Sequence, residues 1–372
     1  MACFAPLVYK TEYYMWGNLT RHSITIWPLL FSYICFLIYY RGMKTINSND
    51  ITYVVPISRK TEDILYFTCL IMMSIIMISY YAMSTNVVDF STNYESDAGV
   101  TLSNGIFGKL GLYAMIIMGG LNTIVIILPF YLISKPNRTR TDYWKAGLFM
   151  FVYILSNFYS ARVMGSRGAL FFTFVNSGFM FFFFRNILTP STKRVIAIVG
   201  ITILFLFIPT VLLISIDRFG DDFVLRICSY FGEPFINFSE IYWNPPKYLN
   251  GDYFLSVFRG DGDSMRYIDG RVPLFLFKTL AGSLYVDFGI IGSIIFLLIY
   301  SSLFRVFLGK VKGGIYLDQL LVYSFTFLGM IYGIFGLKVL GWSGYTILMM
   351  CYLLLRKSRL NKSQKSLSQN KR

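Results

Sequence analysis

The amino-acid sequence predicts an all-α fold: a polytopic bundle of about nine transmembrane helices, within a range of roughly 8–11. Hydrophobic residues make up 55% of the 372 residues and charged residues only 14%, whereas soluble domains carry about a quarter charged residues. The hydrophobic residues form long runs, and the run 195–216 contains no charge. Such a run matches the ~20 residues that cross a bilayer. Backbone amides find no water there, so each run is expected to be a helix.

The apolar runs follow one another along the chain, and aromatic residues such as Trp27, Tyr39 and Trp342 lie near their ends, as in interfacial belts. A large external loop, residues 217–273, separates the sixth run from the seventh. Residues 1–355 are expected to form a single transmembrane domain, and residues 356–372 a basic, disordered cytoplasmic tail. The runs cover residues 24–40, 64–83, 110–133, 146–161, 169–184, 195–216, 284–304, 316–337 and 339–355.

The charges of the connecting segments predict the orientation of the bundle. Segments 41–63, 134–145, 185–194 and 305–315 together with the tail carry 21 lysines and arginines, whereas the alternate segments, apart from the long loop, carry six. Short cytoplasmic loops are enriched in Lys and Arg, while long loops cross the membrane regardless of charge. The first set and the C-terminus are therefore expected in the cytoplasm. The N-terminus and the external loop are expected outside.

Composition also excludes several function classes. The net charge of +15 would suggest nucleic acid for a soluble protein, but the cytoplasmic loops of a membrane protein collect such charges for topological reasons. Membrane lipid, and no nucleic acid, is therefore the expected partner. His22 is the only histidine, and the five cysteines form no CxxC pair, so a metal or redox site is not expected. No cofactor is predicted.

The external loop 217–273 is rich in aromatic residues and carries nine acidic and six basic residues. Loops longer than ~15 residues are usually functional or disordered, and the apolar content is too high for disorder. We expect a folded lid over a site at the outer face; a passive loop that shields helix ends is the alternative. Without a suitable histidine, a carboxylate is the most economical general base. The candidates are Asp217, Asp221, Asp222, Glu233, Glu240, Asp252, Asp261 and Asp263.

A tight outer connection, ARVMGSRGAL, spans residues 161–170 and contains Arg162 and Arg167. Gly165 and Gly168 flank Ser166 and Arg167, which permits a close backbone turn. Such a turn would aim a guanidinium at a phosphate, which its planar fork suits. The alternative is an arginine that merely reaches the lipid headgroups. A pyrophosphate at this face would need two or three arginines, and Arg218, Arg266 and Arg271 are further candidates.

A third feature is AGSLYVDFGIIG, residues 281–292, where Asp287 lies at the start of an apolar run. The simpler interpretation is a carboxylate stabilised by the helix dipole. The functional interpretation is that Asp287 orients a loop arginine, while Gly282, Gly289 and Gly292 allow close helix packing.

These three features together resemble a known family, the bacterial O-antigen polymerases of the Wzy type. GSRGAL (165–170) resembles the outer-face motif of that family, SYFGEPFINFSEIYW (229–243) followed by NGDYF (250–254) resembles its large periplasmic loop, and GSLYVDFGIIGS (282–293) resembles the helix after that loop. The order and spacing of the three agree with the family.

The resemblance implies a GT-C-like fold and a metal-independent glycosyltransferase in the bacterial cytoplasmic membrane. Such enzymes join oligosaccharide repeat units carried on undecaprenyl pyrophosphate, for an O-antigen or a capsule, at the periplasmic face. A chain-length regulator is a further candidate partner. The leaving pyrophosphate is anionic, so arginines can stabilise the charge that develops. Aromatic faces such as Tyr242 and Trp243 are expected to stack on sugar rings. The catalytic candidates are Arg167, Arg218, Arg266 and Arg271, and the substrate-binding candidates are Arg162, Tyr230, Glu233, Asp252, Tyr253 and Asp287.

Two other functions remain as alternatives. A ligase would move the glycan to another acceptor. The lipid-linked glycan ligases that the family resembles usually carry a histidine base in their external loop, and this loop has no histidine. A flippase or transporter is expected to carry charges within its helices and repeated halves, and neither is evident in the runs.

Overall fold

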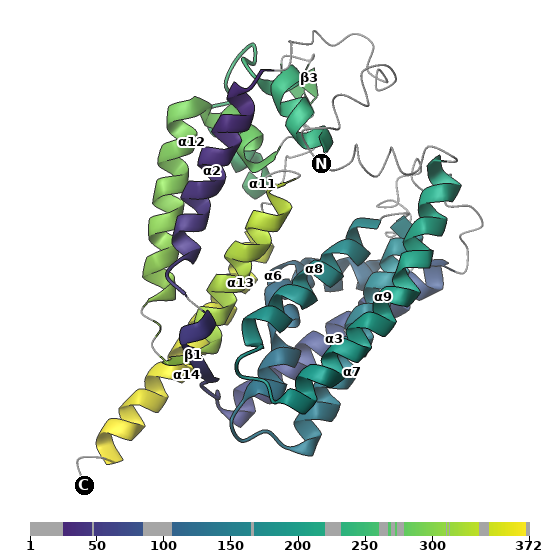
Figure 1. Cartoon of the computed structure of the whole chain (residues 1–372), viewed down its shortest axis with the longest axis vertical. Helices are drawn as coiled ribbons and strands as arrows, with labels where there is room; N and C mark the ends of the chain where they lie inside the picture. Colours follow the sequence, from purple (N-terminus) through teal and green to yellow (C-terminus); the bar gives the residue numbers. More distant parts are fainter. Residues whose placement is uncertain are drawn as a thin grey trace. The chain divides into compact units, whose positions relative to one another are not determined.

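The computed structural model describes residues 25–46, 48–84, 106–164, 167–219, 232–259, 267–268, 272–273, 279–309, 311, 313–334 and 342–369. Within these ranges the chain is mainly helical, with a few very short strands (Figure 1). The contacts divide the chain into two compact units. The first unit comprises Met1–Thr45, Asp221–Gly309 and Phe325–Trp342, and the second comprises Ile46–Gly220, Lys310–Ser324 and Ser343–Arg372. Each unit thus combines segments that are far apart in the sequence.

Each apolar run predicted from the sequence overlaps a helix of the described structure. Several helices extend beyond their run because polar residues continue the helical turns, as Arg59 and Glu62 do at the start of α3. The long helices are α2 (Trp27–Met43), α3 (Arg59–Ser84), α6 (Ile106–Ser134), α7 (Arg140–Met164), α8 (Arg167–Phe184), α9 (Pro190–Phe219), α12 (Thr279–Leu308), α13 (Leu317–Tyr332) and α14 (Trp342–Gln369).

Among the described residues, four helical stretches are long and apolar enough to cross a membrane: Arg59–Ala82, Lys109–Ser134, Pro190–Leu213 and Thr279–Leu308. In Pro190–Leu213, only 6% of the most apolar 18-residue stretch is buried inside the structure. A helix that exposes apolar side chains on most sides requires an apolar surrounding. The prediction of a helical membrane protein is confirmed at this level, and the number of crossings stays a prediction.

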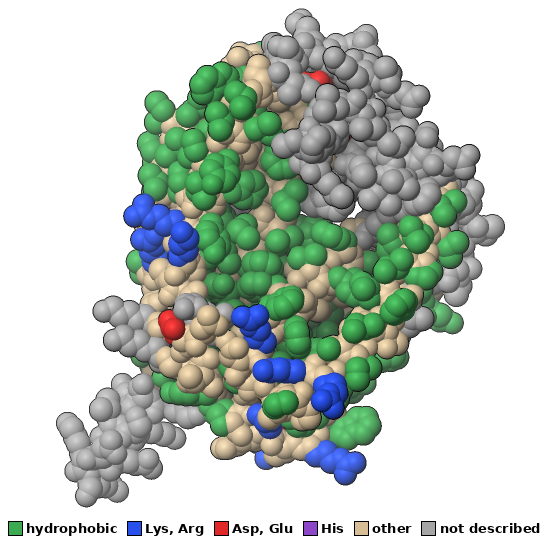
Figure 2. Space-filling model, viewed as in Figure 1, with side chains coloured by type: hydrophobic (Ala, Val, Ile, Leu, Met, Phe, Trp, Pro, Cys, Tyr) green, Lys and Arg blue, Asp and Glu red, His purple; other side chains and the backbone are tan. Residues whose placement is uncertain are grey.

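The exposed surface of the helices is largely apolar. Figure 2 shows hydrophobic side chains over the exposed sides of the helices, whereas Lys and Arg lie near helix ends. On α9 these apolar side chains include Phe205 and Leu213, which are 72% and 67% exposed. A surface of this kind in water would be an association or aggregation liability, whereas lipid covers it naturally.

In the first unit, α2 and α12 pack side by side and run parallel (Figure 1). Phe31 near the start of α2 contacts Tyr285 near the start of α12, with ring centroids 5.7 Å apart. Farther along both helices, Tyr39 stacks on Tyr300 at 5.2 Å. The Tyr39 hydroxyl also donates to the Thr326 carbonyl of α13 at 2.9 Å. The chain therefore runs in the same direction through both helices.

In the second unit, successive helices alternate in direction. α3 and α6 are antiparallel, because Glu62 bonds Lys135 at one end while Tyr80 donates to the Met115 sulfur at the other. α6 is the most enclosed of the candidate spans, with 72% of its apolar window buried. Antiparallel packing of this kind is typical of neighbouring helices in an up-and-down bundle.

The short strands and the end of the chain complete the structure. β1 (Ile51–Val54) pairs in parallel with β4 (Gly313–Ile315), and β2 (Tyr267–Ile268) pairs antiparallel with β3 (Val272–Pro273). The basic tail, residues 356–372, was expected to be disordered, and this expectation is corrected: α14 continues through most of it, to Gln369. Arg359 lies 4.0 Å from the centre of the Tyr316 ring and bonds the buried Asp318 carboxylate at 3.3 Å. These contacts give the basic segment a surface on which to order.

Candidate functional site

The arginine turn lies between α7 and α8. α7 ends at Met164 and α8 begins at Arg167, so only residues 165 and 166 separate the two helices. Arg162 therefore belongs to the last turn of α7, and Arg167 is the first residue of α8. Arg218 is the penultimate residue of α9. All three belong to the second unit, and their side chains lie outside the described part of the structure.

Three other predicted site residues, Tyr230, Arg266 and Arg271, lie outside the described residues altogether. Their roles stay predictions, as do those of the turn arginines. The longest described stretch of the external loop runs from residue 232 to residue 259. It contains the short π-helix η3 (Phe238–Tyr242) and the helix α11 (Asp252–Arg259).

Asp287 is the most constrained of the predicted residues that are described. Only 1% of its surface is exposed. One carboxylate oxygen accepts the backbone N–H groups of Gly251 at 2.9 Å and Tyr253 at 3.2 Å. The other oxygen accepts the Phe254 N–H at 2.8 Å. Among the described residues, its partners are thus backbone amides of the loop, and an arginine partner stays a prediction because Arg266 and Arg271 lie outside the described residues. Asp287 takes the place of the side chain that normally caps a helix N-terminus, since the residue before α11 is a glycine.

α12 is broken next to Asp287. Gly289 has φ 67° and ψ −172°, a conformation inside the helix that only glycine adopts readily. The sequence predicted that Gly289 serves close helix packing, and the structure gives it a different part: it interrupts the helix. The Val286 carbonyl accepts the N–H of Leu249 at 3.1 Å. In an unbroken helix this carbonyl would accept the N–H four residues later. The break therefore leaves the Val286 carbonyl of α12 free to accept a hydrogen bond from the loop.

An aromatic cluster lies beside this contact. Trp243 stacks on Tyr285 with centroids 4.7 Å apart and planes 8° apart, and Phe31 and Phe238 pack around the pair. The Tyr248 hydroxyl donates to the Tyr285 hydroxyl at 3.2 Å. Tyr242 is fully buried, so its expected stacking on a sugar is wrong. Burial raises the pKa of the Tyr242 hydroxyl well above its usual range, and this ring belongs to the core.

The remaining described candidates differ in exposure. Glu233 is half-buried and accepts the Asn237 side-chain amide at 3.3 Å. Asp252, the first residue of α11, is exposed. Tyr253 is half-buried, and burial raises the pKa of its hydroxyl, with a further contribution from the nearby Asp287 charge. The structure thus brings Asp252, Tyr253 and Asp287 together at one helix start, and leaves Glu233 on a separate segment.

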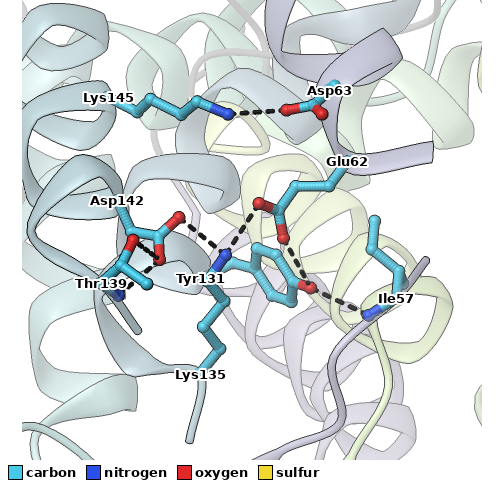
Figure 3. Close-up of polar contacts among 8 residues, drawn as sticks. All are labelled: Ile57, Glu62, Asp63, Tyr131, Lys135, Thr139, Asp142 and Lys145. Atoms are coloured by element: carbon cyan, nitrogen blue, oxygen red, sulfur yellow. Dashed lines mark hydrogen bonds and ion pairs between the residues drawn. The ribbon is translucent and has the colours of Figure 1, made fainter. Parts of the chain in front are cut away.

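Sequence reasoning missed a buried ionic cluster in the second unit (Figure 3). The Lys135 ammonium lies 2.8 Å from the Glu62 carboxylate and 2.8 Å from the Asp142 carboxylate. The Tyr131 hydroxyl donates to Glu62 at 3.3 Å and accepts the Ile57 N–H at 2.9 Å. The cluster joins the start of α3, the end of α6 and the start of α7. Its sequence signal is a pair of opposite charges at facing ends of successive apolar runs.

In this cluster, hydrogen bonds and neighbouring charges affect the pKa values of Lys135 and Asp142 more strongly than burial does. Burial acts to lower the pKa of Lys135, but the bonds to Asp142 and Glu62 raise it above its usual value. Burial acts to raise the pKa of Asp142, but the bonds from Lys135 and Thr139 hold it below its usual value. Both groups are therefore charged at neutral pH. A second pair, Lys145 and Asp63 at 2.6 Å, lies beside the cluster (Figure 3).

Within the described ranges, no group of three acidic, histidine or cysteine side chains is arranged to hold a metal ion. The described part of the candidate site is a mostly buried contact between the loop and the start of α12, made of aromatic rings, backbone amides and the Asp287 carboxylate, with Asp252 exposed at its edge. In comparisons with known proteins, no protein-family model, no curated protein and no solved structure matches the chain.

Proposed function

We propose that the chain is a glycosyltransferase of the bacterial cytoplasmic membrane that polymerises undecaprenyl-pyrophosphate-linked repeat units of a surface polysaccharide, O-antigen or capsule, at the outer face. The observation that carries this proposal is the docking of the aromatic loop segment 232–259 on the broken start of α12. The buried contact gives the loop a fixed position, and a loop held in place can present its exposed residues, such as Asp252, to a bulky hydrophilic glycan at the membrane edge. The passive-loop alternative requires no such ordered attachment.

The contacts of the second unit support the proposed orientation. The segments that the charge pattern assigns to the cytoplasm contact one another: Asn186 bonds Asn49 at 3.0 Å, Tyr143 bonds Thr192 at 3.4 Å, and β1 pairs with β4. Segments on the same side of a membrane must gather in this way. The parallel packing of α2 and α12 agrees with the same assignment, in which both run from outside to inside.

The proposed reaction is a glycosyl transfer without a metal. A hydroxyl at the non-reducing end of a new lipid-linked unit attacks the anomeric carbon of the growing chain. The bond from that carbon to the pyrophosphate oxygen breaks, the oxygen keeps the electron pair, and a loop carboxylate takes the hydroxyl proton. The Arg167 guanidinium, with Arg218 and one of Arg266 or Arg271, stabilises the departing pyrophosphate.

Arg167 tests this proposal most directly. Removing one charge-stabilising donor typically lowers a rate by about 100–1000-fold, and lysine loses the bidentate fork. Arg167→Ala and Arg167→Lys are therefore expected to leave mostly single repeat units on the final acceptor at normal protein abundance. Arg185→Ala is the matched control, because Arg185 is an exposed arginine just beyond the other end of the same helix.

The readout is polymer length on gels beside the amount of each variant in the membrane. Full-length polymer from Arg167→Ala would exclude a role for this arginine at the pyrophosphate. Polymer that accumulates on the lipid carrier in a strain lacking the protein would instead identify a ligase.

One observation favours a second candidate, a polysaccharide flippase. Discontinuous helices such as α12 build the binding sites of many transporters. A flippase mutant would retain lipid-linked single units on the cytoplasmic side, whereas a polymerase mutant exports them. Accessibility of the lipid-linked unit to an external glycosidase in spheroplasts separates the two functions.

A further inference from the structure

The external loop meets α12 at the one place in the described structure where that helix is interrupted. Four loop backbone amides bond to two consecutive α12 residues: Leu249 to the Val286 carbonyl, and Gly251, Tyr253 and Phe254 to the Asp287 carboxylate. The distances lie between 2.8 and 3.2 Å. A segment held by four bonds to two buried residues has a defined position and direction.

The conformation of Gly289 makes this contact possible. Its φ of 67° and ψ of −172° interrupt the helix, so the Val286 carbonyl is available to Leu249. The Tyr248 ring covers the glycine, and an added β-carbon at Gly289 would lie 3.6 Å from that ring. Space therefore allows a methyl group at this position. The backbone conformation does not, because any other residue is strained there.

Side chains extend the contact on both sides of the break. Phe254 of α11 packs edge-on against Phe296 at 5.3 Å, and Phe288 stacks on Phe296 at 5.6 Å. Gly251 has φ 95° and lies against the Phe288 ring. α11 is thus fixed by its amides at its N-terminus and by an aromatic ring beyond the break.

We propose that the break at Gly289 and the Asp287 carboxylate are a docking device that holds α11 and the segment 248–251 in the position from which the loop binds its glycan substrate. Gly289 and Asp287 are positioning residues in this proposal, and neither touches the sugar. The functional half of the proposal rests on the proposed polymerase activity. The docking half rests on the contacts alone.

The test uses the full-length protein in membranes and a cysteine at Ser256, an α11 residue that is 2% exposed. Cys3 and Cys228 are replaced by serine, and the buried Cys35, Cys69 and Cys351 remain. A membrane-impermeant maleimide then reports whether α11 is docked. Gly289→Ala should straighten α12 and raise the labelling rate at position 256 by about tenfold or more, given the strain of a non-glycine residue there.

Two further variants frame this result. Asp287→Asn keeps the shape of the side chain but turns an amide N–H₂ toward one of the loop N–H donors, so labelling should rise here as well. Gly178→Ala is the matched control, because an added β-carbon there meets nothing within 4 Å. It should leave labelling at the parent rate.

Unchanged labelling in Gly289→Ala, or an equal rise in Gly178→Ala, would overturn the docking device. Increased labelling with shortened polymer at normal protein abundance supports the whole proposal. Increased labelling with full-length polymer would overturn the positioning role while leaving the docking contact. If the parent protein makes no polymer in a complementation assay, the proposed function fails, and the labelling still decides the docking contact.

Discussion

The molecule buries carboxylates in two different ways. In the second unit, Glu62 and Asp142 lie on either side of Lys135, with side-chain exposures of 6%, 8% and 11%. In the first unit, Asp287 is equally buried, and within the described residues its carboxylate accepts bonds from three backbone N–H groups. The first arrangement joins three helices to one another. The second joins a helix to a loop.

The difference teaches what each kind of partner can do. A lysine between two carboxylates compensates one of their two negative charges, and removing the lysine leaves both buried carboxylates without a cation. Backbone amides offer partial charges that are spread over a segment, so they hold that segment without a second ionised group. The ionic cluster is therefore expected to control the stability of its whole unit. The Asp287 contact is expected to control local order of the loop.

The largest expected effect is that of Lys135→Met. It leaves Glu62 and Asp142 buried without their cation, which typically costs about 3–5 kcal/mol. Thermal unfolding in detergent should show a markedly lower midpoint than the parent protein. The triple variant with Glu62→Gln and Asp142→Asn removes the unbalanced charge and should recover much of the loss. A parent-like midpoint for the single variant would contradict the cluster as described.

Asp142→Asn is expected to have an intermediate effect of about 1.5–3 kcal/mol, the range for a hydrogen bond to a charged group. The effect should depend on pH in a defined direction. The folded-state pKa of Asp142 lies below its usual value, so its stabilisation is present above about pH 4 and is lost as pH falls further. The pKa of Lys135 is raised, so its stabilisation is lost only as pH rises beyond about 10.4.

The measurement for Asp142 compares unfolding midpoints of variant and parent at pH 7 and below pH 4. The gap between the two proteins should shrink at the lower pH. Asp50→Asn, at an exposed acid of the same unit, should change stability by no more than about 0.5 kcal/mol. A gap that grows on acidification would reverse the sign argued here.

The smallest effect in this series is expected from Tyr131→Phe. The ring keeps its place in the core, while the Ile57 N–H and one Glu62 oxygen lose a partner, at a cost of about 1–2 kcal/mol. Hydrogen exchange at the Ile57 amide should accelerate more than the average for the second unit. If exchange there stays at the parent rate, the hydroxyl does not hold the segment before α3.

The sequence predicted the helices well and their interruptions poorly. Long uncharged runs such as 195–216 predict a helix because hydrocarbon leaves the backbone no other partner. The start of α3 at Arg59 lies outside the apolar run because polar residues can also be helical, and hydropathy alone does not detect them. The pairing of β1 with β4 was not predicted, since strands of three or four residues so far apart in sequence carry no periodic signal.

The candidate site was predicted only in part, because its geometry depends on backbone conformation and main-chain partners that the sequence pattern does not show. The residues around Asp287 stood out in sequence, but a glycine in an apolar run looks the same whether it permits close packing or breaks the helix. Only the backbone conformation of Gly289 separates the two. The partners of Asp287 could not be predicted either, because they are main-chain amides of any residue type. Lys135 carried a usable signal, a cation where one apolar run ends and the next begins.

The parallel pairing of α2 and α12 has a consequence for how the chain is made. The Tyr39 hydroxyl donates to the carbonyl of Thr326, which lies 287 positions later in the sequence. α2 is therefore synthesised long before the helices against which it packs. Until α12 and α13 are synthesised, α2 must be kept by lipid or by the insertion machinery. A chain interrupted before residue 279 would therefore hold the second-unit helices α3 to α9 without the rest of that unit, together with an α2 that lacks its packing partner.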